Sequence, residues 1–316
     1  MKNINRVFYV VCIIFLISCN PQKKYINDAL DKIQTHSMKK DQINWHDYRA
    51  KVLEYGKNNK TIDDAHKTIK YALLLLQDGH SFFVSSKDMK KEYSDTTAKK
   101  ITSIASEYNN EIGYIKIPGF IGNEKLEKAF ASRIQDLIRD LDKQKISGWM
   151  IDLRGNTGGN MWPMLLGIGP ILGDGIAGYF VNDKKEFNMW GYAEGKTFDG
   201  GSIISKIDTP YRLKNTNKKI AVLINNSTAS SGEAIAVAFK GLPNTRFFGK
   251  ATRGLTTGNS TIILSDSSRI FLMTVVYADR NKILYGKQII PDEIAMDGDA
   301  KELAIKWINW EMILKN

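Results

Sequence analysis

Two short apolar segments, each followed by a turn of small residues and a helix-like pattern, constrain the fold most strongly. They are GWMIDLRGNTGG, residues 148–159, and KIAVLINNSTASSGEAIAVAFK, residues 219–240. Short apolar runs of this kind are typical of strands buried on both faces, and strands that alternate with helices form parallel sheets. The chain is therefore predicted to be an α/β protein built from βαβ units.

Other segments extend this prediction to a mixed sheet. Residues 123–145 carry apolar side chains at helical spacing, and residues 111–120 alternate as a strand does. Residues of about 260–290 have the composition of β-hairpins, and residues 299–316 have the pattern of a closing helix. Parallel strands and hairpins in one chain favour a mixed sheet over a purely parallel one.

The N-terminus has the pattern of an export signal. Lys2 and Arg6 precede an apolar run of about eleven residues, too short for a comfortable membrane span and typical of a secretory signal. The run ends in LISC, which resembles a bacterial lipobox. That resemblance implies removal of residues 1–18 and a lipid on Cys19; an ordinary signal peptide with an incidental cysteine is the alternative. We expect a lipid-anchored protein of the bacterial cell envelope.

Composition divides the remaining chain into three parts. The polar, lysine-rich residues 19–40 predict a tether, residues 41–80 a helical N-terminal subdomain, and residues 81–316 the α/β core. Cys12 within the signal is the only cysteine besides Cys19, so the mature chain has no thiol pair for a disulfide or a cysteine metal site. No metal and no cofactor are expected.

The formal net charge of +11 says little about specific partners. The lysines are scattered rather than gathered in one stripe with aromatic residues, and export argues against nucleic acid as a partner. A basic surface that faces anionic envelope components, or solubility alone, accounts for the charge.

Two side chains are candidates for catalysis. Ser230 lies where a helix begins, among free backbone N–H groups, so it fits a nucleophile or equally an ordinary N-cap. His80, in DGHSFF, lies between a helix and an apolar strand and fits a general base or a capping histidine. The other histidines, His36, His46 and His66, are expected to be solvated.

One glycine-rich segment resembles a phosphate-binding loop without matching it. GKATRGLT, residues 249–256, has the spacing of a Walker loop, but Leu255 stands where the lysine is required. A nucleotide site is therefore not expected.

Six segments together resemble the carboxyl-terminal processing, or tail-specific, serine protease family. In chain order they are DGHSFF, IGYIKIPGF, GWMIDLRGNTGG, AVLINNSTASSGEAIAVAFK, FFGKATRG and IIPDE, and they cover about 78–295. The resemblance implies a crotonase/ClpP-like core, a protein or peptide substrate, and a nucleophile three positions before Glu233, which is Ser230. It also implies oxyanion donors at the backbone N–H groups of Ser231 and of Gly158 or Gly159.

The resemblance also implies how the serine is activated. One branch of the family uses a lysine where this chain has Leu255. The other branch resembles the tricorn protease core and uses a histidine from the early segment, which His80 matches. That branch has an acidic residue where this chain has Tyr285, so the residue that orients the histidine stays open, with Ser81, Asp78 and Tyr285 as candidates.

The predicted function is a lipid-anchored envelope serine peptidase that works through a Ser230–His80 acyl-enzyme mechanism. Only about 26 residues separate DGHSFFV from EIGYIKI, so an inserted PDZ domain does not fit. A catalytically inactive module of the same fold that binds a peptide or an apolar ligand is the alternative. An envelope adaptor that acts through its basic surface is a third hypothesis.

Overall fold

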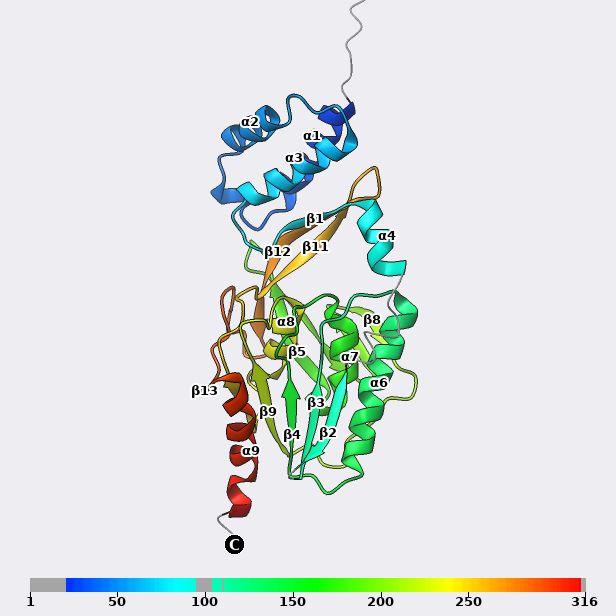
Figure 1. Ribbon diagram of the computed structural model, residues 1–316, viewed down its shortest axis with the longest axis vertical. Helices are drawn as coiled ribbons and strands as arrows, with labels where there is room; N and C mark the ends of the chain where they lie inside the picture. The colour runs from blue at the N-terminus through cyan, green and yellow to red at the C-terminus, as the bar shows by residue number, and fades with distance from the viewer. Residues whose placement is uncertain (1–20, 95–103, 110, 314–316) are drawn as a thin grey trace, which may run out of the picture.

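Two β-sheets and the helices around them are stacked along one long axis in the computed structural model, which describes residues 21–94, 104–109 and 111–313 (Figure 1). The N-terminal elements are α1 (Pro21–His36), η1 (Lys40–Gln42), α2 (Trp45–Tyr55), α3 (Ile62–Leu75), β1 (Phe82–Val84) and α4 (Ser86–Ser94). None of the helices within the described ranges is both long and apolar enough to cross a bilayer.

The mixed sheet supplies the framework for the rest. Its strands lie in the order β13 (Glu293–Ile294), β10 (Thr245–Gly249), β9 (Lys219–Ile224), β4 (Gly148–Asp152), β3 (Ile112–Lys116) and β2 (Ala105–Asn109). All neighbouring strands pair in parallel except β2, which is antiparallel to β3. The α/β class and the mixed sheet predicted from the sequence are thus confirmed.

Helices cover both faces of this sheet because its central strands are apolar on both sides. In β4, Trp149 and Ile151 point into one buried cluster, whereas Met150 points into another. The first cluster is shared with α6 (Glu124–Asp142), α7 (Met161–Leu172) and α8 (Ser231–Phe239), and the second with α9 (Asp297–Ile313). Figure 1 shows α9 on the outer face of the sheet.

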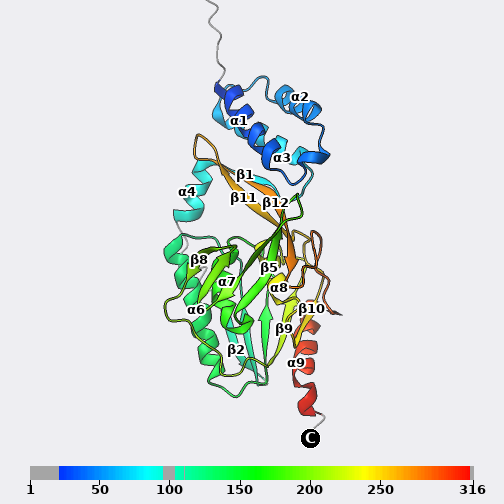
Figure 2. The ribbon, with the colours of Figure 1, turned by 180° about the vertical axis from the view of Figure 1, so that it is seen from behind.

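The second sheet is antiparallel and reaches beyond the core. Its order is β1, β12 (Arg269–Asp279), β5 (Gly175–Val181), β6 (Phe187–Ala193), β7 (Lys196–Asp199) and β8 (Ser202–Lys206), with β11 (Thr257–Ile263) on β12 as well. One end of β12 pairs with β1 and the other with β5. Figure 2 shows the long β11–β12 hairpin bridging the N-terminal helices and the core.

The N-terminal helical unit begins earlier than predicted. The tether predicted for residues 19–40 is wrong from Pro21 onward, because α1 buries Tyr25, Ile26, Leu30 and Ile33 against the other helices and the hairpin. These apolar residues recur at helical spacing between lysines that face solvent, so the polar composition hid an amphipathic helix. The predicted signal peptide and Cys19 lie outside the described residues.

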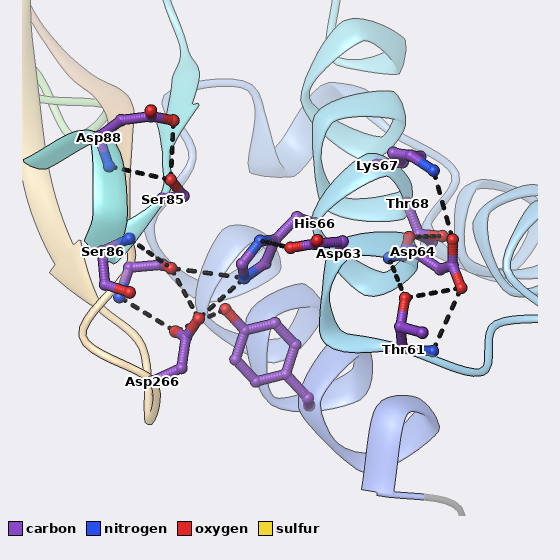
Figure 3. A network of polar contacts seen from close by, with 12 residues as sticks. Thr61, Asp63, Asp64, His66, Lys67, Thr68, Ser85, Ser86, Asp88 and Asp266 are labelled. Carbon is purple, nitrogen blue, oxygen red and sulfur yellow. Dashed lines mark hydrogen bonds and ion pairs between the residues drawn. The ribbon is translucent and has the colours of Figure 1, made fainter.

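A polar network ties the helical unit to the tip of the hairpin (Figure 3). His66 is only 9% exposed, so the prediction that it is solvated is wrong. Its Nε2 lies 2.8 Å from Asp266 Oδ2, and the hydroxyls of Tyr25 and Ser268 donate to the same carboxylate at 2.8 and 2.7 Å. The backbone N–H of Ser86 donates to Ser268 Oγ at 3.0 Å, which brings the start of α4 into the network.

Replacing Asp266 by asparagine is expected to destabilise the protein at neutral pH. Burial alone raises the pKa of Asp266, but hydrogen bonds from Ser268, Tyr25 and His66 outweigh it and lower this pKa to about 2. A carboxyl whose pKa is lower in the folded state stabilises the fold above its unfolded pKa of about 4, and this contribution is lost as the pH falls to about 2. Urea denaturation at pH 7 should therefore show a loss of about 1–2 kcal/mol in the free energy of unfolding.

The pH dependence separates this effect from a general weakening. The difference between wild type and Asp266→Asn should shrink as the pH falls from about 4 toward 2, because the wild-type carboxyl is then neutralised too. The control is Asp208→Asn, whose exposed carboxylate pairs only with Lys206 and should change the free energy by less than about 0.5 kcal/mol. An equal loss in both variants contradicts the prediction.

Candidate active site

Three loops meet at the carboxyl ends of the parallel strands, where ligands bind in open α/β sheets. They follow β3, β4 and β9, and they lead into the N-termini of α6, α7 and α8. Figure 1 shows these helix ends at the same edge of the mixed sheet. The free N–H groups of the helix starts therefore converge on one place.

Asn156 joins the three loops. Its fully buried side chain donates from Nδ2 to the carbonyl of Ile117 at 3.1 Å and accepts from the N–H of Gly158 at 3.0 Å. Its own carbonyl accepts from the N–H of Ala229 at 2.9 Å. One side chain and its peptide thus fix the loops relative to one another.

Ser230 precedes α8 in an unusual backbone conformation. Its φ is 53° and its ψ is −120°, a region that residues with a side chain rarely adopt. Its N–H donates to Glu233 Oε2 at 2.9 Å, which fixes the peptide in place. Strain of this kind persists only where surrounding contacts impose it, and it is frequent at functional sites.

Glu233 is the anchor for this conformation. The fully buried carboxylate also accepts from Thr252 Oγ1 at 2.5 Å and from the N–H groups of Gly254 and Leu255 at 2.8 Å each. Burial raises the pKa of Glu233, and these hydrogen bonds oppose that rise. Leu255, at the position of the lysine in the other branch of the resembled family, thus contributes a peptide N–H to the structure around Ser230.

His80 lies between α3 and β1 with its ring directed at Ser230. Its Nε2 is 2.8 Å from Ser230 Oγ, and its Nδ1 is 2.6 Å from Thr257 Oγ1 at the start of β11. The residue is 8% exposed. Burial lowers the pKa of His80, and the negative charge of Asp78 partly opposes this, so a neutral imidazole is favoured at neutral pH.

The backbone of His80 is held from two sides. Asp78 Oδ1 accepts from the N–H groups of His80 and Ser81 at 2.9 and 2.8 Å. Asn259, two residues after Thr257, donates from Nδ2 to the carbonyl of His80 at 3.0 Å. The strand that carries the ring's partner therefore also holds the main chain.

None of the three candidates for the orienting residue bonds to the imidazole. Ser81 Oγ donates to Asp78 Oδ2 at 2.5 Å, and Tyr285 donates to Asp279 at 3.1 Å. Thr257, which the sequence prediction missed, occupies that place. A hydroxyl in the loop-to-strand segment TRGLTTG was the available signal, but spacing did not distinguish it from its neighbours.

Gly158 lies directly against the start of α8. Its φ is 102°, and a Cβ there would come within 2.9 Å of Ser230 Cβ and 3.1 Å of the Ser231 nitrogen, so only glycine fits. Its N–H already donates to Asn156 Oδ1. Of the two glycines predicted as oxyanion donors, Gly158 is thus the one whose N–H has a partner.

Gly159 and Ser231 leave their N–H groups available. A Cβ on Gly159 would lie 2.0 Å from the carbonyl oxygen of Phe120, and the Gly159 carbonyl accepts from Ser231 Oγ at 2.5 Å. Neither N–H donates to another residue of the described ranges. Two adjacent backbone donors beside a hydroxyl and an imidazole can bind a developing oxyanion.

The remaining predicted residues lie away from this cluster. His36 and His46 are exposed, as predicted. Across residues 21–94, 104–109 and 111–313, no group of three or more histidine, cysteine, aspartate or glutamate side chains is arranged to hold a metal ion.

Comparison with known proteins covers almost the whole chain. The model of peptidase family S41 matches residues 111–295. The nisin-resistance protein of Lactococcus lactis subsp. lactis is 30% identical over 295 residues, which are 93% of this chain and 89% of that protein. The carboxy-terminal processing protease CtpA of Bacillus subtilis is 26% identical over 52% of this chain and 30% of its own length.

Solved structures share the fold. A lipoprotein from Streptococcus agalactiae superposes with a TM-score of 0.75 and 24% identity over 98% of this chain and 100% of that one. The photosystem II D1 C-terminal processing protease gives 0.56 and 13% over 87% and 93%. Because the family match spans more than half of the sequence and the similarity to the nisin-resistance protein is nearly full-length, this chain is a member of peptidase family S41.

Proposed function

We propose that this chain is a serine peptidase with Ser230 as nucleophile and His80 as general base. The observation that carries the proposal is the imidazole placed between two hydroxyls, 2.8 Å from Ser230 Oγ and 2.6 Å from Thr257 Oγ1. Membership of a peptidase family supports the same chemistry.

The mechanism follows from the protonation of the ring. When Nδ1–H donates to Thr257, the lone pair of Nε2 faces Ser230 and can take its proton as Oγ attacks a peptide carbonyl. The N–H groups of Ser231 and Gly159 stabilise the oxyanion. The imidazolium then protonates the leaving amine, an acyl-enzyme forms on Ser230, and water releases it with His80 again as base.

Thr257 is a positioning residue in this scheme. Its hydroxyl fixes the ring orientation and tautomer but carries no charge to stabilise the imidazolium. Thr257→Val, which keeps the shape and removes the hydroxyl, should lower kcat by about 10- to 100-fold with little change in KM. Thr257→Ser should restore most of the activity, and steady-state kinetics on a fluorogenic peptide measures both.

A purely structural role for Thr257 gives a different result. In that case valine and serine would lower thermal stability and kcat together, and the pH profile of kcat/KM would keep its shape. Loss of the Nδ1 acceptor should instead shift the acid limb of that profile. The outcome against the positioning role is a valine variant with wild-type kcat.

A fluorophosphonate probe tests the proposed function. The folded protein should be labelled covalently, and mass spectrometry should place the adduct on the peptide that contains Ser230. Binding of an active-site serine probe requires the activated hydroxyl and the oxyanion donors but no knowledge of the substrate. Folded protein without labelling between pH 6 and pH 9 would favour the inactive peptide- or ligand-binding module instead.

Substrate and location are proposed from different observations. One similar protein is named for resistance to nisin, so nisin is a candidate substrate; incubation with purified protein and mass spectrometry of the products tests it. The LISC motif supports a lipid anchor on Cys19 and a place in the bacterial cell envelope. Metabolic labelling with a fatty-acid analogue, compared in wild type and Cys19→Ala, tests the anchor.

A further inference from the structure

A pocket of about 270 Å³ opens at the edge of the mixed sheet that carries the candidate active site. Its walls come from the first turns of α6 and α7 and from β8, which lie together in Figure 1. Pro163, Leu166, Ile203 and Ile204 supply apolar surface, and Glu127 supplies a carboxylate. Ile203 and Ile204 are 60% and 42% exposed.

One residue connects this pocket with the oxyanion loop. Asn160 follows Gly159 directly, and its Nδ2 donates to Glu127 Oε1 at 2.8 Å. Its N–H donates to the carbonyl of Phe120 at 2.6 Å, and its Oδ1 caps α7 by accepting from Trp162 at 3.0 Å. A side chain in the pocket therefore lies within a few residues of a peptide bond held at Ser230.

The charges around the pocket cancel except at Glu127. Glu124 pairs with Lys128 at 3.1 Å, and Lys206 pairs with Asp208 at 3.1 Å. Glu127 has no cationic partner among the described residues, and half-burial raises its pKa with Glu124 adding to the rise. A half-buried carboxylate beside apolar surface is poorly compensated, so a cation that reaches it gains more than at an open surface.

We propose that this pocket binds a lysine or arginine side chain of the peptide substrate close to the scissile bond, with its ammonium or guanidinium group at Glu127. The inference rests on the proposed peptidase function and adds a substrate preference to it. A long cationic side chain matches both walls, because its methylene stem packs on apolar surface while its head remains at the polar end. A shorter or acidic side chain satisfies only one of these features.

Matched peptides test the preference. Fluorogenic peptides that differ only in carrying lysine, norleucine or glutamate are compared at each of about four positions on either side of the cleaved bond. At one position the kcat/KM ratio of lysine to norleucine should be about tenfold, as a half-buried ion pair of about 1.4 kcal/mol gives. The readout is this ratio within each variant, so any general loss of activity cancels.

Variants at the pocket then assign the preference. Glu127→Gln should bring the ratio close to one, and Glu127→Lys should favour glutamate at the same position. Glu302→Gln, on the exposed surface of α9, is the control and should keep the wild-type ratio. A ratio unchanged in Glu127→Gln, or wild type without a lysine preference, overturns the pocket assignment. Failure of fluorophosphonate labelling overturns the peptidase proposal itself, so the two failures are distinguishable.

Discussion

Ser230→Ala is expected to lower kcat/KM on peptides by about 10⁴-fold or more and to abolish covalent labelling by a fluorophosphonate. The hydroxyl is the only group of Ser230 that the change removes. The backbone hydrogen bond from Ser230 to Glu233 stays, and alanine has the same Cβ, so the site should keep its shape. Peptide hydrolysis, monitored by fluorescence and mass spectrometry, measures the loss.

A serine in the same loop supplies the matched control for this experiment. Ser227 is exposed, and its hydroxyl makes no hydrogen bond to another residue of the described ranges. Ser227→Ala should therefore keep wild-type kinetics and labelling. If Ser230→Ala retained more than about a hundredth of the wild-type activity, the nucleophile would have to be another group.

His80→Ala should lower kcat/KM by about 10⁴-fold at pH 7, because Ser230 then has no base within hydrogen-bonding distance. Only the neutral imidazole can take the proton. Because burial lowers the pKa of His80, wild-type kcat/KM should be high at neutral pH and fall as the pH drops through an apparent pKa below 6.5. Kinetics of both proteins between pH 4.5 and pH 9 check the magnitude and the sign.

The alanine variant should lose this acid limb along with its activity. An exposed histidine is the control: His46→Ala, whose ring contacts only Asp47, should keep both the rate and the pH profile. A His80→Ala protein with the wild-type pH profile would show that the base is elsewhere, whatever its absolute rate.

The sequence was most informative where local pattern decides the structure. The strands around Trp149 and Val222 are apolar on both faces because helices cover both sides of the sheet, and such runs are readable without coordinates. The helix α1 was missed because its lysines dominate the composition, although Ile26, Leu30 and Ile33 keep a helical period. Composition and periodicity disagreed there, and burial followed periodicity.

Contacts between distant segments could not be read from local pattern. His66 was assigned to solvent because its partner, Asp266, is 200 positions away at the tip of a hairpin. The pairing of Ser230 with His80 was anticipated through family resemblance, not through spacing. Thr257 was not, because its place beside the imidazole depends on how β11 and β12 carry the hairpin past β1.

The early start of α1 bears on how a lipid-anchored form would meet its substrates. The described chain is already helical at Pro21, two positions after the proposed lipid attachment at Cys19, and α1 is packed against the hairpin. An enzyme on a long leash sweeps a wide zone above a bilayer, whereas this body would be held nearly upright and its hydrolytic cleft kept at one height. Peptides passing at that height, rather than those deep in the medium, would then be its diet.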